Sequence, residues 1–163
     1  MHARAAEFAE LARERYGLDL EVLEFDEGTK TAAAAAEAVG CETAAIASTI
    51  VVSLSGGPHD GDLVAAITSG ANRLDLDAVA AHFDADAAEM GDPDAIRRTV
   101  GWSIGGVPPL CHEMAVPTVF DPTLSEFDVV YGAAGTPSAV FPIDPETLAD
   151  LADATIVDVT ESA

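Results

Sequence analysis

The sequence predicts an α+β domain: a mixed, mainly antiparallel curved sheet, or a partly open barrel, flanked by short helices. Segments rich in β-branched residues are interspersed with short helix-like segments, without the regular spacing of βαβ units. Two strand-like segments flank the turn-forming stretch SGGPHDGD (55–62), which indicates a hairpin. Several helix-like segments begin at a capping residue and end at glycine, which keeps the predicted helices short.

The first half of the chain is predicted to hold two helices, a short strand and the hairpin. HARAAEFAELARERYG (2–17) has apolar residues at helical spacing and a stop at Gly17. VLEF (22–25) has the pattern of a short strand. GTKTAAAAAEAVG (28–40) combines a threonine cap, strong helix formers and a final glycine. The hairpin strands are AIASTIVVSL (45–54) and LVAAITS (63–69).

The second half is predicted to alternate between capped helices and strands. Asp75 caps the helix LDAVAAHF (76–83), after a glycine-bearing corner. In DPDAIRRTVG (92–101), aspartate is the cap, proline takes the first helical position and glycine ends the helix; DPETLADLA (144–152) repeats this start. The remaining predicted strands are VPTVF (116–120), FDVVYGAA (127–134), SAVFPI (138–143) and TIVDV (155–159).

Length and charge describe the setting of the protein more than its activity. The 163 residues predict one domain over 1–163, with 1–17 as an N-terminal helix. The net charge is −22, with acidic residues in every segment. Such self-repulsion is weakened in molar salt, where the screening length is roughly 3 Å, so the composition is typical of a halophile. An acidic protein that avoids polyanions is the alternative.

The chain carries no sign of secretion or membrane insertion. It has two cysteines, no signal-like N-terminus and no apolar run near the about 20 residues that span a bilayer. We therefore expect free thiols, a cytoplasmic protein and no membrane partner. The basic residues beyond the first helix form no basic patch in the sequence, and we expect no DNA binding. They are Lys30, Arg73, Arg97 and Arg98.

Common catalytic patterns are weak in this chain. Cys111, His112 and Glu113 are adjacent, and neighbours in an extended segment point to opposite faces, so we expect no metal site. The same adjacency argues against a thiol–imidazole catalytic pair. Neither a GxSxG elbow nor a phosphate-binding loop is present.

The loop VGWSIGGVPPLCHEM (100–114) is the most unusual segment. Residues 101–109 carry no charged side chain, although the chain has 29 acidic residues. Gly105 and Gly106 allow a ligand to approach the backbone, while Pro108 and Pro109 stiffen the loop and remove two N–H donors. The remaining N–H groups can converge on one oxygen, which is the geometry of a site for an oxyanion or an ester carbonyl.

Three loops in order resemble a known family. TSGANRLD (68–75), GWSIGGVPPLCH (101–112) and AAGTPSAVF (133–141) are similar to those of the YbaK/EbsC family, the prolyl-tRNA-synthetase-associated editing domain. The resemblance runs from about Lys30 to Val159. It implies a trans-acting deacylase that hydrolyses the ester of a small mischarged amino acid on tRNA, without metal or organic cofactor. The implied partners are the aminoacyl-tRNA 3′ end and, as a further candidate, an aminoacyl-tRNA synthetase.

The resemblance also implies a site. The backbone of Gly105, Gly106 and Val107, in the GxxxP element that ends at Pro109, would hold the aminoacyl carbonyl, and a hydroxyl of the terminal ribose would help to activate water. Candidates for the wall of the acyl pocket, which can equally be ordinary core residues, are Ile50, Val52, Ile67 and Val107. Substrate-binding candidates are Lys30, Ser48, Thr49, Ser69, Gly70, Asn72, Arg73, His112 and Gly135.

One position departs from the family pattern. Where the family usually has a lysine, in I-x-K-[ST]-L, the segment IASTI (46–50) has Ser48. The resemblance implies that this lysine contacts the tRNA end, so its loss weakens or abolishes deacylation unless Lys30 or Arg73 compensates. A non-catalytic member that binds a tRNA end, a nucleotide or a protein partner is therefore the alternative. His112 either touches the substrate or braces the loop.

Overall fold

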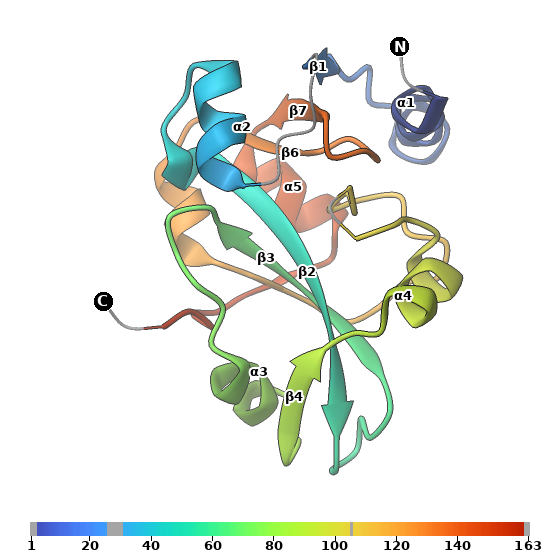
Figure 1. The fold of residues 1–163 in the computed structure, drawn as a ribbon, viewed down its shortest axis with the longest axis vertical. Coiled ribbons are helices and arrows are strands. Elements are labelled where there is room, and N and C mark those ends of the chain that lie inside the picture. Colours follow the sequence, from blue (N-terminus) through green and yellow to red (C-terminus); the bar gives the residue numbers. More distant parts are fainter. Residues whose placement is uncertain (1–2, 26–30, 105, 162–163) are drawn as a thin grey trace.

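A single mixed sheet organises the computed structural model, which describes residues 3–25, 31–104 and 106–161 (Figure 1). Its strand order is β1-β7-β6-β2-β3-β5-β8, and β4 pairs with β2 beside this path. The strands are β1 (Leu23–Glu24), β2 (Ile46–Ser55), β3 (Leu63–Ser69), β4 (Ala87–Met90), β5 (Thr118–Phe120), β6 (Val130–Ala133), β7 (Ala139–Ile143) and β8 (Thr155–Ile156).

The α+β prediction is confirmed, with an open sheet rather than a closed barrel. β2 and β3 form the predicted hairpin, in which Ala47 pairs with Ser69 and Ser53 with Leu63. The β1–β7, β2–β4 and β6–β7 pairs are also antiparallel, whereas β2–β6, β3–β5 and β5–β8 are parallel. Because β1 and β8 are the two ends of the strand order, the described strands do not close on themselves.

The helices begin and end where the local signals place them. Side chains of Thr31, Asp75, Asp92 and Asp144 accept hydrogen bonds from N–H groups of the first turn, and Gly101 ends its helix in the left-handed conformation. These caps satisfy backbone groups that would otherwise lack partners. The helices are α1 (Ala3–Tyr16), α2 (Ala32–Val39), α3 (Leu76–His82), α4 (Pro93–Val100) and α5 (Pro145–Leu151).

β4 is the strand that the sequence does not predict. Its sequence, AAEM, contains no β-branched residue, and it becomes a strand because it pairs with β2 from Val52 to Ser55. Two 3₁₀ turns, η1 (Thr43–Ala45) and η2 (Pro122–Glu126), were also not predicted.

Two main groups of buried side chains form the core. The larger one joins Phe8 of α1 to Trp102, Phe120 and Phe141, all of which are at most 2% exposed. The smaller one lies between α3 and the sheet and includes Val52 and Val79. Within the described residues, no helix combines the length and the hydropathy that crossing a membrane requires.

Candidate functional site

A break in strand pairing creates the candidate site. On the edge of β2 opposite β3, β6 pairs with residues 46–47 and β4 pairs with residues 52–55. Residues 48–51 therefore have no strand partner on this edge in the described part of the chain. The carbonyl of Ile46 accepts from Gly70 on the β3 side, and that of Val51 accepts from Gly91 on the other side. This alternation points the Thr49 backbone N–H and C=O to the open edge.

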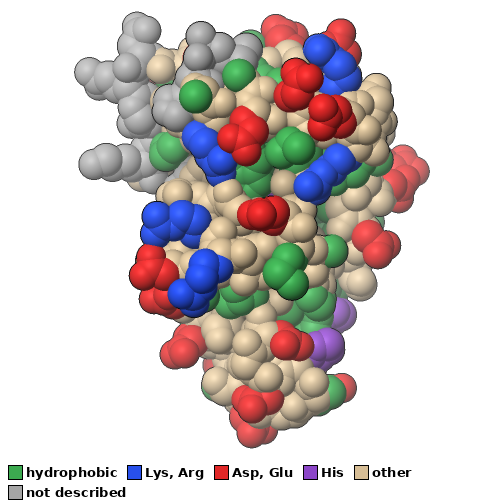
Figure 2. All heavy atoms as spheres, turned by 90° about the vertical axis from the view of Figure 1, so that its right-hand side faces the viewer, with side chains coloured by type: hydrophobic (Ala, Val, Ile, Leu, Met, Phe, Trp, Pro, Cys, Tyr) green, Lys and Arg blue, Asp and Glu red, His purple; other side chains and the backbone are tan. Residues whose placement is uncertain are grey.

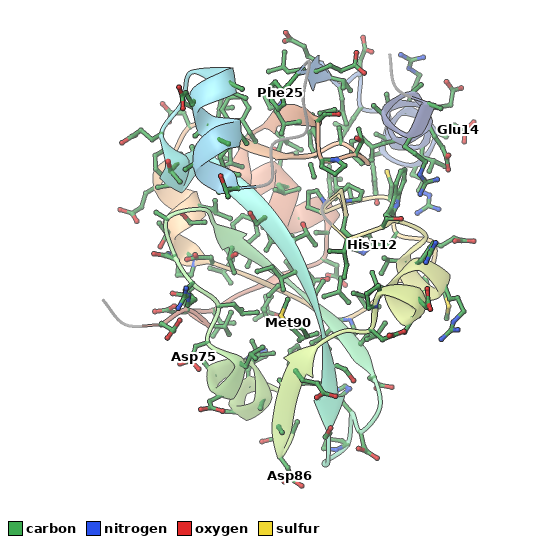
Figure 3. All side chains as sticks on the ribbon, in the orientation of Figure 1. Glu14, Phe25, Asp75, Asp86, Met90 and His112 are labelled. Carbon is green, nitrogen blue, oxygen red and sulfur yellow. The ribbon has the colours of Figure 1, made fainter. Side chains whose placement is uncertain are left out.

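A cavity of about 260 Å³ lies along this open edge. Its lining comes from β2, α2, α4, β6 and β7, and from the loops that contain Val107 and Thr136. Ile96, Ile104, Val107 and Val140 supply apolar wall, and none of the described lining residues carries a charge. Met90, at the end of β4 beside β2, also lines the cavity (Figure 3). Such a cavity suits a small, largely apolar group with a few polar atoms.

Thr49 places an unpaired hydroxyl at this cavity. Its Oγ1 is buried and has no hydrogen-bond partner among the described residues, and Thr49 and Ser48 both line the cavity. Buried hydroxyls are nearly always paired in folded proteins, because an unpaired one loses its hydration without compensation. A polar atom of a ligand or a water molecule would satisfy Thr49.

The second and third sequence loops pack against each other at the cavity. A Cβ on Gly106 would lie 2.7 Å from the Cα and 2.8 Å from the N of Thr136, so only glycine allows the two backbones to approach this closely. Gly135 has φ +91°, and a Cβ there would lie 2.6 Å from the Trp102 ring. Gly135, predicted to bind substrate, does not line the cavity and instead packs against Trp102.

The GxxxP element offers fewer donors than its sequence suggests. The Gly106 N–H donates to the Ser103 carbonyl at 3.0 Å, and Pro108 and Pro109 have no N–H. Val107 is buried, lines the cavity and has a backbone N–H with no acceptor in the described part of the chain. Gly105 lies outside the described residues. Among the described residues of this element, Val107 therefore carries the available donor.

His112 lies at the far end of the loop and does not line the cavity. His112 is labelled in Figure 3. Its Nε2 donates to the Pro108 carbonyl at 2.7 Å, and a carbonyl acceptor requires the proton on that nitrogen. Burial lowers the pKa of His112 below its usual value; the hydrogen bond to the Pro108 carbonyl opposes this, and the Arg15 charge adds a smaller lowering, so the neutral ring is favoured. This geometry supports the bracing role over substrate contact.

The first loop motif is tied to a buried carboxylate that the sequence analysis missed. Asp121 accepts from the Ser69 N–H at 3.0 Å and from the Asn72 amide at 2.9 Å, and it also caps η2. Ser69 Oγ donates to the Ala44 carbonyl, and Gly70 packs against α2 and η1. The Asp-Pro dipeptide at 121–122 is the helix-start signal that could have drawn attention to Asp121.

Several other predicted residues lie away from the cavity. Arg73 forms an exposed ion pair with Glu161 at 3.6 Å. Val52 and Ile67 are fully buried in the core and do not line the cavity, whereas Ile50 and Val107 do. Lys30 lies outside the described residues. No group of three or more His, Cys, Asp and Glu side chains in the described part of the chain is arranged to hold a metal ion.

Comparisons with known proteins identify the family. A family model described as the aminoacyl-tRNA editing domain matches residues 26–151, which include all three loops and the cavity. The chain belongs to the aminoacyl-tRNA editing domain family. This editing domain is similar, at 31% identity and a TM-score of 0.90, to a solved structure described as a proposed trans-editing enzyme for prolyl-tRNA synthetase, with 99% of each chain covered.

Two further solved structures share the fold of this editing domain. One, from work on grafting epitopes onto scaffold proteins, has 31% identity and a TM-score of 0.90 and is covered over 100% of both chains. The hypothetical protein APE2540 has 25% identity and a TM-score of 0.82, with 94% of this chain and 99% of that chain covered. The family match begins at residue 26, so α1 lies outside it.

Proposed function

We propose that this editing domain is a trans-acting deacylase, which hydrolyses the ester between a small amino acid and the terminal ribose of tRNA. The observation that carries the proposal is a cavity of about 260 Å³ whose described lining residues carry no charge, walled by the GxxxP loop, in a member of the aminoacyl-tRNA editing family. The similar solved structure described as a proposed trans-editing enzyme matches this chain over almost its full length, which supports action without a synthetase body.

The cavity supplies positioning rather than a nucleophile. In this proposal, the Val107 N–H donates to the ester carbonyl, and the Thr49 hydroxyl, which has no partner among the described residues, bonds to a polar atom of the substrate. Water attacks the carbonyl carbon, the ester C–O bond breaks, and the ribose oxygen takes up a proton. Removing one preorganised oxyanion donor typically costs about 10²- to 10³-fold in rate, so a single well-placed N–H is a substantial contribution.

Size and polarity would select the acyl group. The walls formed by Ile96, Ile104 and Val140 offer contact to a short aliphatic side chain and no partner for a charged one. A pocket that admits small acyl groups complements a synthetase that cannot reject them by binding energy alone. Small uncharged amino acids such as alanine, serine, cysteine and proline are therefore the substrates that the cavity favours.

An arginine-bearing face can accept the phosphates that follow the terminal ribose. Arg13 lies on α1, and Arg97 and Arg98 lie on α4, whose Ile96 reaches the cavity. Figure 2 shows arginine side chains gathered on the side of the molecule where α1 and α4 lie, with acidic groups between them. No basic patch is evident in the sequence, because these two helices are distant in the chain. On a protein of net charge −22, a polyanion meets least repulsion here.

The test is single-turnover deacylation of alanyl-, seryl-, cysteinyl- and prolyl-tRNA by the purified protein in molar salt. We expect hydrolysis of at least one substrate well above the protein-free rate, unaffected by a metal chelator. Ser48→Lys should raise kcat/KM about 10-fold, because a charge-assisted contact of about 1.4 kcal/mol is restored at the cavity.

The replacement of the family lysine by Ser48 favours a second candidate, a non-catalytic binder of tRNA ends. Binding of these tRNAs without turnover, in both wild type and Ser48→Lys, would reject the deacylase and support this binder. Turnover by wild type would reject the binder. Lys30→Ala and Arg73→Ala test compensation for the missing lysine, since either should slow turnover if its charge fills that role.

A further inference from the structure

The N-terminal helix α1 contacts both ends of the loop that walls the cavity. At the start of the loop, the Arg4 guanidinium donates to the Gly101 carbonyl and lies 4.0 Å from the centre of the Trp102 ring. At the end of the loop, Arg15 donates to the His112 carbonyl at 2.7 Å, and the Tyr16 hydroxyl accepts from the Cys111 N–H at 3.3 Å. None of Arg4, Arg15 and Tyr16 lines the cavity.

Tyr16 contacts Cys111, which has an unfavourable backbone conformation. Cys111 has φ +65°, in the left-handed region that residues with a Cβ rarely adopt. Its N–H is held by Tyr16, and its carbonyl accepts from Trp102 Nε1 at 3.0 Å. Such conformations persist when the surrounding contacts determine them. Cys111 is therefore held from both sides, once by the loop itself and once by α1.

Trp102, near the start of the loop, contacts α1 directly. It is 2% exposed, and Phe8 of α1 contacts its ring edge-on with centroids 6.0 Å apart. Another neighbour of the ring is Gly135, whose backbone approaches so closely that no Cβ would fit, and whose Cβ position is also 2.9 Å from the Arg4 carbonyl of α1. Trp102 thus contacts both α1 and the 133–138 loop, and Thr136 of that loop contacts Gly106. A displacement of α1 would be transmitted to the cavity wall through these contacts.

We propose that α1 is a positioning helix for the GxxxP loop, in which Arg4, Arg15 and Tyr16 hold the loop ends so that Val107 stays at the cavity. This inference rests on the proposed function for its kinetic consequence. The three residues act through the loop backbone and touch no reacting atom, so they are positioning residues. Misplacing a reacting group by about 1 Å can cost 10²-fold in rate, which sets the expected scale.

The experiment compares Tyr16→Phe, Arg4→Gln and Arg4→Lys with a control, Glu10→Gln, which alters an exposed position of the same helix. Trp102 is the single tryptophan of the chain, so its fluorescence and its quenching by acrylamide report on the loop alone. Single-turnover rates over a range of enzyme concentrations separate kcat from KM. Far-UV circular dichroism measures the folded fraction independently of Trp102.

We expect Tyr16→Phe and Arg4→Gln to remain folded, to lose about 10-fold or more in kcat with KM changed less than 3-fold, and to show stronger quenching. Arg4→Lys should recover part of the rate, because it restores a cation over Trp102. Wild-type kcat and quenching in folded variants would overturn the proposal, as would a rate that falls only in proportion to the folded fraction.

The failure of the proposed function would be recognised separately. If wild type shows no turnover, the deacylase proposal fails, and the quenching measurement still decides whether α1 holds the loop. Unchanged quenching in Tyr16→Phe and Arg4→Gln would then overturn the positioning role, while increased quenching relative to Glu10→Gln would support it.

Discussion

Gly106→Ala is the sharpest test of how the two cavity loops are held together. The added Cβ would lie 2.7 Å from the Thr136 Cα, whereas ordinary van der Waals contact begins at 3.4 Å. The backbones must therefore part by about 0.7 Å, and neither contacting atom is on a flexible side chain. Overpacking of this kind typically costs about 1–3 kcal/mol of stability. Because Val107 is the next residue, the same shift moves the proposed donor.

We expect Gly106→Ala to fold and to have a kcat/KM that is reduced about 10- to 100-fold. Single-turnover deacylation measures kcat/KM, and urea unfolding measures the stability. Gly61→Ala is the control, because Gly61 has φ +84° with nothing within 4 Å of its Cβ position and lies at the hairpin turn. It should lose about 1 kcal/mol of stability through backbone strain while keeping wild-type kinetics. A folded Gly106→Ala protein with wild-type kcat/KM would refute the reasoning.

Three further predictions concern residues at or behind the cavity. Thr49→Val should raise the free energy of unfolding by about 1 kcal/mol, because it removes an unpaired buried hydroxyl. The same change should lower kcat/KM, and unchanged kinetics would contradict the role of Thr49 in binding substrate. Asp121→Ala should lower that free energy by about 2–4 kcal/mol in urea unfolding, since the Ser69 N–H and the Asn72 amide lose a buried acceptor, and Asp121→Asn should recover part of it. Burial lowers the pKa of His112 below 6.5. As the pH falls below 6.5, the unfolded state therefore takes up a proton that the folded state does not, and the free energy of unfolding declines. His112→Gln should make this decline shallower by up to about 1.4 kcal/mol per pH unit, and equal slopes would contradict it.

Sequence patterns predicted the parts of this protein that are decided within a few residues. Asp92, Pro93 and Gly101 bound α4 because capping and left-handed termination involve only neighbouring backbone groups. The turn cluster at 55–62 predicted the hairpin for the same reason. The fold class followed from the order of such elements, and the family followed from three loop motifs in sequence order.

Features that depend on distant partners escaped the sequence analysis. β4 has no strand pattern of its own and is extended because β2 supplies its hydrogen bonds. Asp121 accepts from Ser69 and Asn72, about fifty residues earlier in the chain, whereas the neighbouring Pro122 signals only its role as the cap of η2. Val52 and Ile67 shared the apolar character of Ile50, but only pairing and twist decide which β2 and β3 side chains reach the cavity.

By itself the sequence determined the five α-helices in the described part of the chain, most of the strands and the family to which the three loops belong. Only the tertiary structure decided three features. A gap between β6 and β4 leaves the edge of β2 open, Gly106 packs against Thr136, and α1 contacts both ends of the GxxxP loop. The physical reason is that caps and turns are satisfied by neighbouring backbone groups, whereas cavities and loop supports arise from close packing between segments far apart in the chain.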